Sequence, residues 1–134
     1  MPRIAPPSGS PPPATAPHGD GRLELRPLAD TVVDRYFTEF PEDLDRYGEV
    51  ARPWAIHDTL YILQWALLDV AGLADVAHEL NWLADVLAAR DFPLEHLRRN
   101  AALCADVLAE HHAAAAAERL RAAAHGLRVR TDSP

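Results

Sequence analysis

Apolar residues recur at helical spacing along most of the chain, from Leu28 to Leu127. The pattern predicts four principal helices over residues 28–40, 54–70, 73–90 and 94–126, and a short helical turn over 42–47. No stretch alternates apolar and polar residues in the way that a half-buried strand does. We therefore predict an all-α, four-helix bundle-like domain.

The segment 54–70 is the element around which this domain is expected to be organised. Between Leu60 and Leu68 only Gln64 is strongly polar. Such a helix is too apolar on every side for a surface position and too short to cross a bilayer. We expect its neighbours to cover most of its circumference, and we expect Gly72 to end it.

The last predicted helix carries more apolar surface than one bundle contact can bury. Beyond Leu108 it has a second stripe with no obvious partner inside the chain, formed by Leu120, Ala123, Ala124 and Leu127. Exposed apolar area of this kind is typical of an interface, and a two-fold dimer is the commonest way to cover it. We predict a homodimer with Leu120 and Ala124 among its contacts.

The two ends of the chain have a different composition. Residues 1–27 contain eight of the 12 prolines, with Ser, Thr and Gly between them, and this composition offers no core. The predicted organisation is a disordered Pro-rich tail over 1–27, a helical domain over 28–127 and a disordered tail over 128–134.

Charge and cysteine content limit the classes of partner and the cellular compartment that we expect for this protein. The formal net charge of −7 disfavours nucleic acid and an anionic membrane surface as partners. The single cysteine, Cys104, has no second cysteine for an intramolecular disulfide, and the first residues lack the apolar run of a signal peptide. We expect a cytoplasmic protein.

Catalytic and metal motifs are not recognisable. The run from His78 to Trp82 begins like a zinc-protease helix, but it has Trp82 where a second histidine is needed. No serine or cysteine has a recognisable base near it in the sequence, and the glycines form no phosphate-binding loop. We predict no enzyme activity, no catalytic residues, no metal site and no cofactor.

One group of polar and aromatic residues on the central helix is a candidate ligand site. Helical spacing places its members on adjoining faces: His57, Asp58, Tyr61, Gln64 and Trp65. His78 and Trp82 on the next helix complete the predicted ligand-binding set, since a lone histidine suits an axial haem ligand and a tryptophan suits a chromophore pocket. The alternative is a satisfied polar network at the edge of the core, with the aromatic rings as core packing.

A family resemblance covers part of the same region. It rests on Asp58, Thr59 and Tyr61, on Trp82-Leu83, and on the run Leu-Ala-Ala-Arg-x-x-Pro-Leu-Glu-x-Leu from Leu87 to Leu97. Over residues 58–108 the chain resembles a helical module of bacterial sensory and regulatory proteins that is often found next to cobalamin-binding domains. The residue after Tyr61 is Ile62, where that module has histidine. The resemblance therefore implies a regulatory or interaction role and carries over no cobalamin ligand.

Together these observations predict a small regulatory or protein–protein interaction domain that has a protein partner and self-associates. The alternative is a sensor that binds a small molecule or a tetrapyrrole, such as cobalamin or haem, between its helices.

Overall fold

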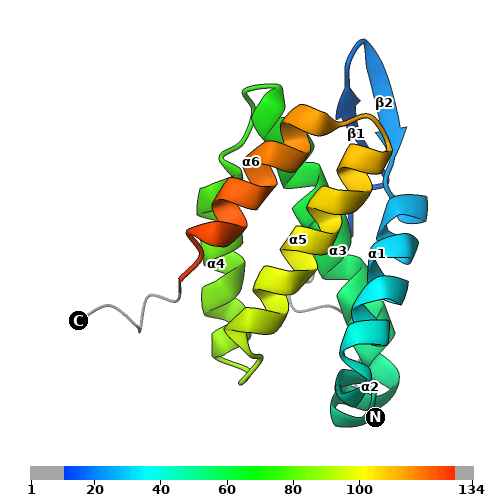
Figure 1. Cartoon of the computed structure of the whole chain (residues 1–134), viewed down its shortest axis with the longest axis vertical. Coiled ribbons are helices and arrows are strands. Elements are labelled where there is room, and N and C mark those ends of the chain that lie inside the picture. The colour runs from blue at the N-terminus through cyan, green and yellow to red at the C-terminus, as the bar shows by residue number, and fades with distance from the viewer. Residues whose placement is uncertain (1–10, 129–134) are drawn as a thin grey trace.

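A computed structural model describes residues 11–128 of the chain (Figure 1). Its helices are α1 (Arg26–Glu39), α2 (Pro41–Tyr47), the 3-10 turn η1 (Gly48–Val50), α3 (Ala51–Val70), α4 (Val76–Ala88), α5 (Leu94–Glu110) and α6 (Ala114–His125). The two strands of a small hairpin, β1 (Thr15–His18) and β2 (Gly21–Glu24), precede them. The prediction of an all-α domain is confirmed.

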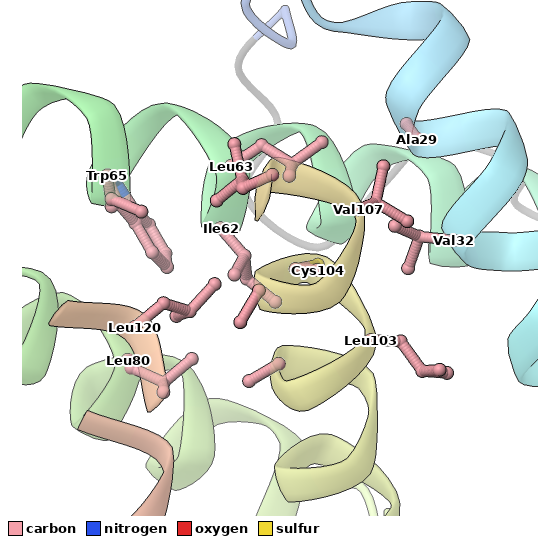
Figure 2. Packing of buried hydrophobic residues seen from close by; sticks show 14 of the residues in the cluster. Ala29, Val32, Ile62, Leu63, Trp65, Leu80, Leu103, Cys104, Val107 and Leu120 are labelled. Carbon is pink, nitrogen blue, oxygen red and sulfur yellow. The ribbon is translucent and has the colours of Figure 1, made fainter. Parts of the chain in front are cut away.

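Helix α3 is the central helix, as its apolar circumference predicted. It packs against α1, α2, α4, α5, α6 and β1. Figure 2 shows Ile62 and Leu63 of α3 in one cluster with Leu80 of α4 and Val107 of α5. Gly72 ends the helix in the left-handed conformation, with φ of 77°, and the amide of the following residue bonds back into the last turn.

The predicted single helix over 94–126 is wrong. His112 adopts a left-handed conformation with φ of 65°, and the amide of Ala113 donates to the carbonyl of Leu108. The chain therefore reverses between α5 and α6, and α6 packs on α5, α3 and α4. The second apolar stripe is buried by this reversal rather than by a partner.

This reversal corrects the predicted interface residues. Leu120 is 0% exposed and Ala124 is also buried within the chain. Figure 2 shows Leu120 pointing into the same cluster as Ile62 and Leu80. Neither Leu120 nor Ala124 is therefore available as a contact between two folded copies.

The predicted disordered tail over 1–27 is wrong for residues 11–27, which form the hairpin and the start of α1. Strands β1 and β2 pair antiparallel with Ala16 opposite Leu23, and Gly19 in the turn has φ of 58°. Ala16 and Leu25 are fully buried, and β1 packs on α3. Tertiary burial of these two side chains offsets an ordering cost that the local composition cannot. Residues 1–10 and 129–134, the remaining parts of the predicted tails, lie outside the described residues.

Among residues 11–128, no helix is both long enough and apolar enough to cross a membrane.

Candidate functional site: a cavity at one end of the bundle

A cavity of about 70 Å³ lies where five helices meet at the α2 end of the domain, opposite the hairpin (Figure 1). It is partly open to solvent. Residues of α1, α2, α3, α4 and α5 line it, together with Phe92 from the α4–α5 connection. Its walls are mainly aromatic and aliphatic: Tyr36, Phe37, Tyr47, Trp54, Leu87, Phe92 and Leu97.

The helical spacing of α3 explains why this end of the bundle is hollow. Ala51, Ala55 and Asp58 lie three to four residues apart and share one face, and Trp54 borders that face. Alanine side chains leave room that larger residues would fill. The cavity therefore forms because α3 has the small residues Ala51 and Ala55 beside Trp54 and Asp58.

Three buried polar side-chain atoms of cavity-lining residues have no hydrogen-bond partner. They are the Tyr47 hydroxyl, the Trp54 indole Nε1 and the Asn100 Oδ1, and they are the buried unpaired side-chain nitrogen and oxygen atoms found among residues 11–128. Asn100 is only 8% exposed, and its Nδ2 donates to the Thr59 hydroxyl at 3.3 Å. Buried polar groups are nearly always paired, so three orphans in one cavity indicate a place where another molecule supplies the missing partners.

Asp58 is the charged group of the cavity wall on α3. Its side chain is 16% exposed, and one carboxylate oxygen lies 3.2 Å from His57 Nδ1. Burial raises the pKa of Asp58 above its ordinary value, against smaller opposing effects of His57 and Arg90. A carboxylate with so little compensation in a cavity is a typical feature of a binding site.

Arg90, in the turn that follows α4, also lines the cavity. It is exposed, and its guanidinium carbon lies 5.8 Å from the centre of the Trp54 ring. This distance is within the range of a cation–π interaction. Arg90 and Asp58 line the same cavity but form no ion pair within 4.0 Å of each other.

Asp43 belongs to a second, fully paired network beside the cavity. The Tyr36 hydroxyl donates to its carboxylate, and His96 Nδ1 lies 2.9 Å from the same oxygen. Burial and then the bond to Asp43 raise the pKa of Tyr36 well above its ordinary value, so the hydroxyl remains a donor. The His96 ring stacks on Phe40 with ring centres 4.0 Å apart. This network fastens α2 to α1 and α5.

Of the seven predicted ligand-binding residues, only Asp58 lines the cavity. His57, Tyr61 and Trp65 instead form a ladder of rings along α3, with centres 4.9 and 5.9 Å apart. The Tyr61 hydroxyl donates to the Pro11 carbonyl at 2.9 Å. Gln64 is half-buried on the same helix and is not part of the cavity lining.

His78 and Trp82 lie apart from this group, on an outer face of α4. His78 is exposed in the first turn, where its amide donates to the Asp75 side chain. Trp82 is 50% exposed. The structure therefore does not join the α3 and α4 parts of the predicted ligand set into one site.

The remaining cavity residues escaped the sequence prediction because they come from different helices. Trp54 and Asp58 are four residues apart, and this spacing was the available signal. Tyr47 lies 43 residues before Arg90, and Asn100 lies on a different element from either, so no local pattern relates the three.

A second hollow of about 300 Å³ lies between the hairpin and the α5–α6 turn. Small residues line most of it, and its His18 Nε2 lies 3.3 Å from the His112 carbonyl oxygen. No buried unpaired polar side-chain atom of residues 11–128 belongs to its lining. The hollow is larger but lacks groups that require a ligand.

Metal and thiol chemistry have little support in this part of the chain. Among residues 11–128, no three His, Cys, Asp or Glu side chains gather closely enough to hold a metal ion. Cys104 is fully buried, and burial raises the pKa of its thiol well above the ordinary value. A thiol in this environment stays protonated and inert.

Comparisons with models of protein families, with curated protein sequences and with solved structures found no match to this chain.

Proposed function

We propose that this chain is a small regulatory domain that binds a small organic molecule in the cavity lined by α1, α2, α3, α4 and α5. The observation that carries the proposal is that three residues lining one mainly aromatic cavity each have a buried, unpaired polar atom. Few, well-placed polar groups in an apolar wall are typical of small-molecule sites. The cavity volume of about 70 Å³ suits a ligand of a few heavy atoms, not a tetrapyrrole.

An organic ligand satisfies this cavity better than water does. A buried water needs two to four polar partners. Besides the unpaired atoms of Tyr47, Trp54 and Asn100, the walls offer apolar ring faces. A molecule with an apolar body and polar ends would bond these atoms and also cover the rings.

The position of the cavity supports a regulatory role. Its lining comes from α1, α2, α3, α4 and α5, so a bound molecule would contact each of these helices. Any ligand that binds only the folded arrangement stabilises that arrangement. We propose that occupancy shifts the packing of α2 and the α4–α5 connection, which form the rim.

Titration with two neutral probes, n-propanol and phenol, tests the proposal. The readout is the indole N–H resonance of each tryptophan in a nitrogen-15 NMR spectrum. We expect millimolar probe to move the Trp54 signal, because Trp54 lines the cavity and its N–H is buried without a hydrogen-bond partner. The signals of Trp65 and Trp82, which do not line the cavity, should stay in place.

A cavity-filling variant provides the control. Ala55→Leu adds three carbons to the α3 wall and should abolish the Trp54 response while helical circular dichroism is retained. Ala109→Leu makes the same change at an exposed position of α5 and should leave the response intact. Equal movement of all three indole signals, or none, would contradict the proposal.

Protein interaction is a second candidate function, and the exposed face of α4 favours it. Trp82 is half exposed, and Leu73 in the preceding turn is exposed as well. Exposed large apolar side chains such as these are enriched at interfaces. We propose a second copy of the chain as its occupant. Sedimentation at micromolar concentration should then give a dimer for the wild type and a monomer for Trp82→Glu.

A further inference from the structure

Five polar groups of the cavity lining, three of them unpaired, fall into two chemical sets. The first set accepts hydrogen bonds: the Asp58 carboxylate and the Asn100 Oδ1. The second set donates them: the Trp54 indole N–H, the Tyr47 hydroxyl and the guanidinium of Arg90. A ligand that serves both sets needs a donor group at one end and an acceptor group at the other.

The charges of Asp58 and Arg90 define the two ends of such a ligand further. Asp58 is largely buried and Arg90 is exposed, so the negative group lies in the wall and the positive group lies at the rim. Their charges affect each other, because Arg90 acts to lower the pKa of Asp58. They are nevertheless more than 4.0 Å apart, and Arg90 rests over the Trp54 ring instead. The two charges are therefore not paired with each other, and a group that carries both opposite charges would complement them.

The other acid of the lining does not compete for such a ligand. Asp43 is 2% exposed and accepts bonds from Tyr36 and His96. Its charge is already engaged within the bundle. Asp58, with one partner in its own helix, is the carboxylate that an incoming ammonium group would meet.

We infer that the cavity takes a small zwitterion, with its ammonium group on Asp58 and Asn100 and its carboxylate facing Arg90, Trp54 and Tyr47. This is the chemistry of a small aliphatic α-amino acid, and the inference rests on the proposed ligand-binding function. The volume of about 70 Å³ limits the ligand to a short side chain, which would lie against Leu87 and Leu97. An ammonium group on Asp58 would provide the compensation that burial leaves missing.

A set of four matched probes tests the two charges separately. 2-Aminobutyrate carries both groups, n-propylamine lacks the carboxylate, butyrate lacks the amine, and n-propanol lacks both. Each is titrated against the full chain at pH 7.5, with the Trp54 indole signal as the readout. We expect 2-aminobutyrate to bind about tenfold or more tightly than either singly charged probe, since each charge-assisted hydrogen bond adds about that factor.

Two variants assign each charge to its partner. Asp58→Asn should remove the advantage of 2-aminobutyrate over butyrate, and Arg90→Gln should remove its advantage over n-propylamine. The affinity of each variant for n-propanol, the neutral probe, is the reference for both comparisons. The matched controls Glu118→Gln and Arg121→Gln alter exposed charges of α6, which contributes no residue to the cavity, and should change nothing.

The outcomes separate this inference from the proposal on which it rests. If n-propanol moves the Trp54 signal and the added charges bring no gain, the zwitterion is refuted and the ligand cavity stands. Binding of n-propylamine as tight as that of 2-aminobutyrate would also overturn the inference. If none of the four probes moves the Trp54 signal selectively, both statements fail.

Discussion

The two aspartates of the cavity wall, Asp43 and Asp58, have opposite surroundings. The Asp43 carboxylate accepts a hydrogen bond from the Tyr36 hydroxyl of α1, and the same oxygen lies 2.9 Å from His96 Nδ1 of α5. Groups from two other helices therefore pair this oxygen. The Asp58 carboxylate has one side-chain hydrogen bond, to its neighbour His57, and burial raises the pKa of Asp58.

This difference indicates that Asp43 stabilises the fold, whereas Asp58 belongs to the proposed binding site. A fully paired buried network stabilises one arrangement of the helices that supply its members. A poorly compensated carboxylate next to orphan polar atoms lowers the stability of the free protein, and such a cost is typical of sites prepared for a ligand. Substitutions at the two clusters should therefore act on stability in opposite directions.

The largest effect is expected for Asp43→Ala. The change leaves the Tyr36 hydroxyl and the His96 ring without their partner in a buried place, and each lost bond to a charged group is costly. We expect the free energy of unfolding to fall by about 3 kcal/mol, measured by urea denaturation. An effect as small as that of a surface substitution would show that this network does not hold α2 in place.

A pair of tyrosine variants sharpens the comparison at the level of one oxygen atom. Tyr36→Phe removes a hydroxyl that donates to Asp43 and should cost about 1–2 kcal/mol. Tyr47→Phe removes a buried hydroxyl that has no partner, so it should be neutral or stabilising. Urea denaturation of both variants measures the contrast. A Tyr47→Phe loss equal to that of Tyr36→Phe would mean that Tyr47 is paired in solution.

Asp58→Asn should raise the melting temperature at pH 7.5. Because the pKa of Asp58 is raised in the folded state, the folded protein holds this proton at pH values where the unfolded chain has released it. Ionisation of Asp58 therefore lowers stability as the pH rises through the folded-state pKa. The gain from asparagine should be present at pH 7.5 and should shrink towards zero below about pH 3.8, the ordinary pKa of the group. Thermal scans of both proteins across this range give the difference.

The smallest effect is expected next to the paired network. Glu42 precedes Asp43 in the first turn of α2 and is exposed. Glu42→Ala should change the free energy of unfolding by no more than about 0.5 kcal/mol. A loss close to that of Asp43→Ala would show that α2 responds to any change of charge, and the comparison between the two aspartates would lose its meaning.

The sequence by itself determined the helical character of the chain and its central element. The 3.6-residue spacing of apolar side chains is a local property, so it predicted α1, α3, α4 and α5 without knowledge of their neighbours, although it joined α5 and α6 in one helix. The run between Leu60 and Leu68 predicted burial of α3 because a helix apolar on all sides must be covered. Gly72 predicted the helix end through its freedom to adopt positive φ.

Only the tertiary structure decided where the chain reverses and which polar groups meet. His112 takes a left-handed conformation that its residue type does not predict. This conformation lets α6 turn back, so that Leu120 is buried against other helices. The hairpin likewise depends on packing of Ala16 against α3, not on its proline-rich composition. The cavity joins Tyr47, Trp54 and Asn100, whose proximity arises from helix packing. Local patterns report which face of a helix is buried, but they do not say which residues from distant segments share that burial.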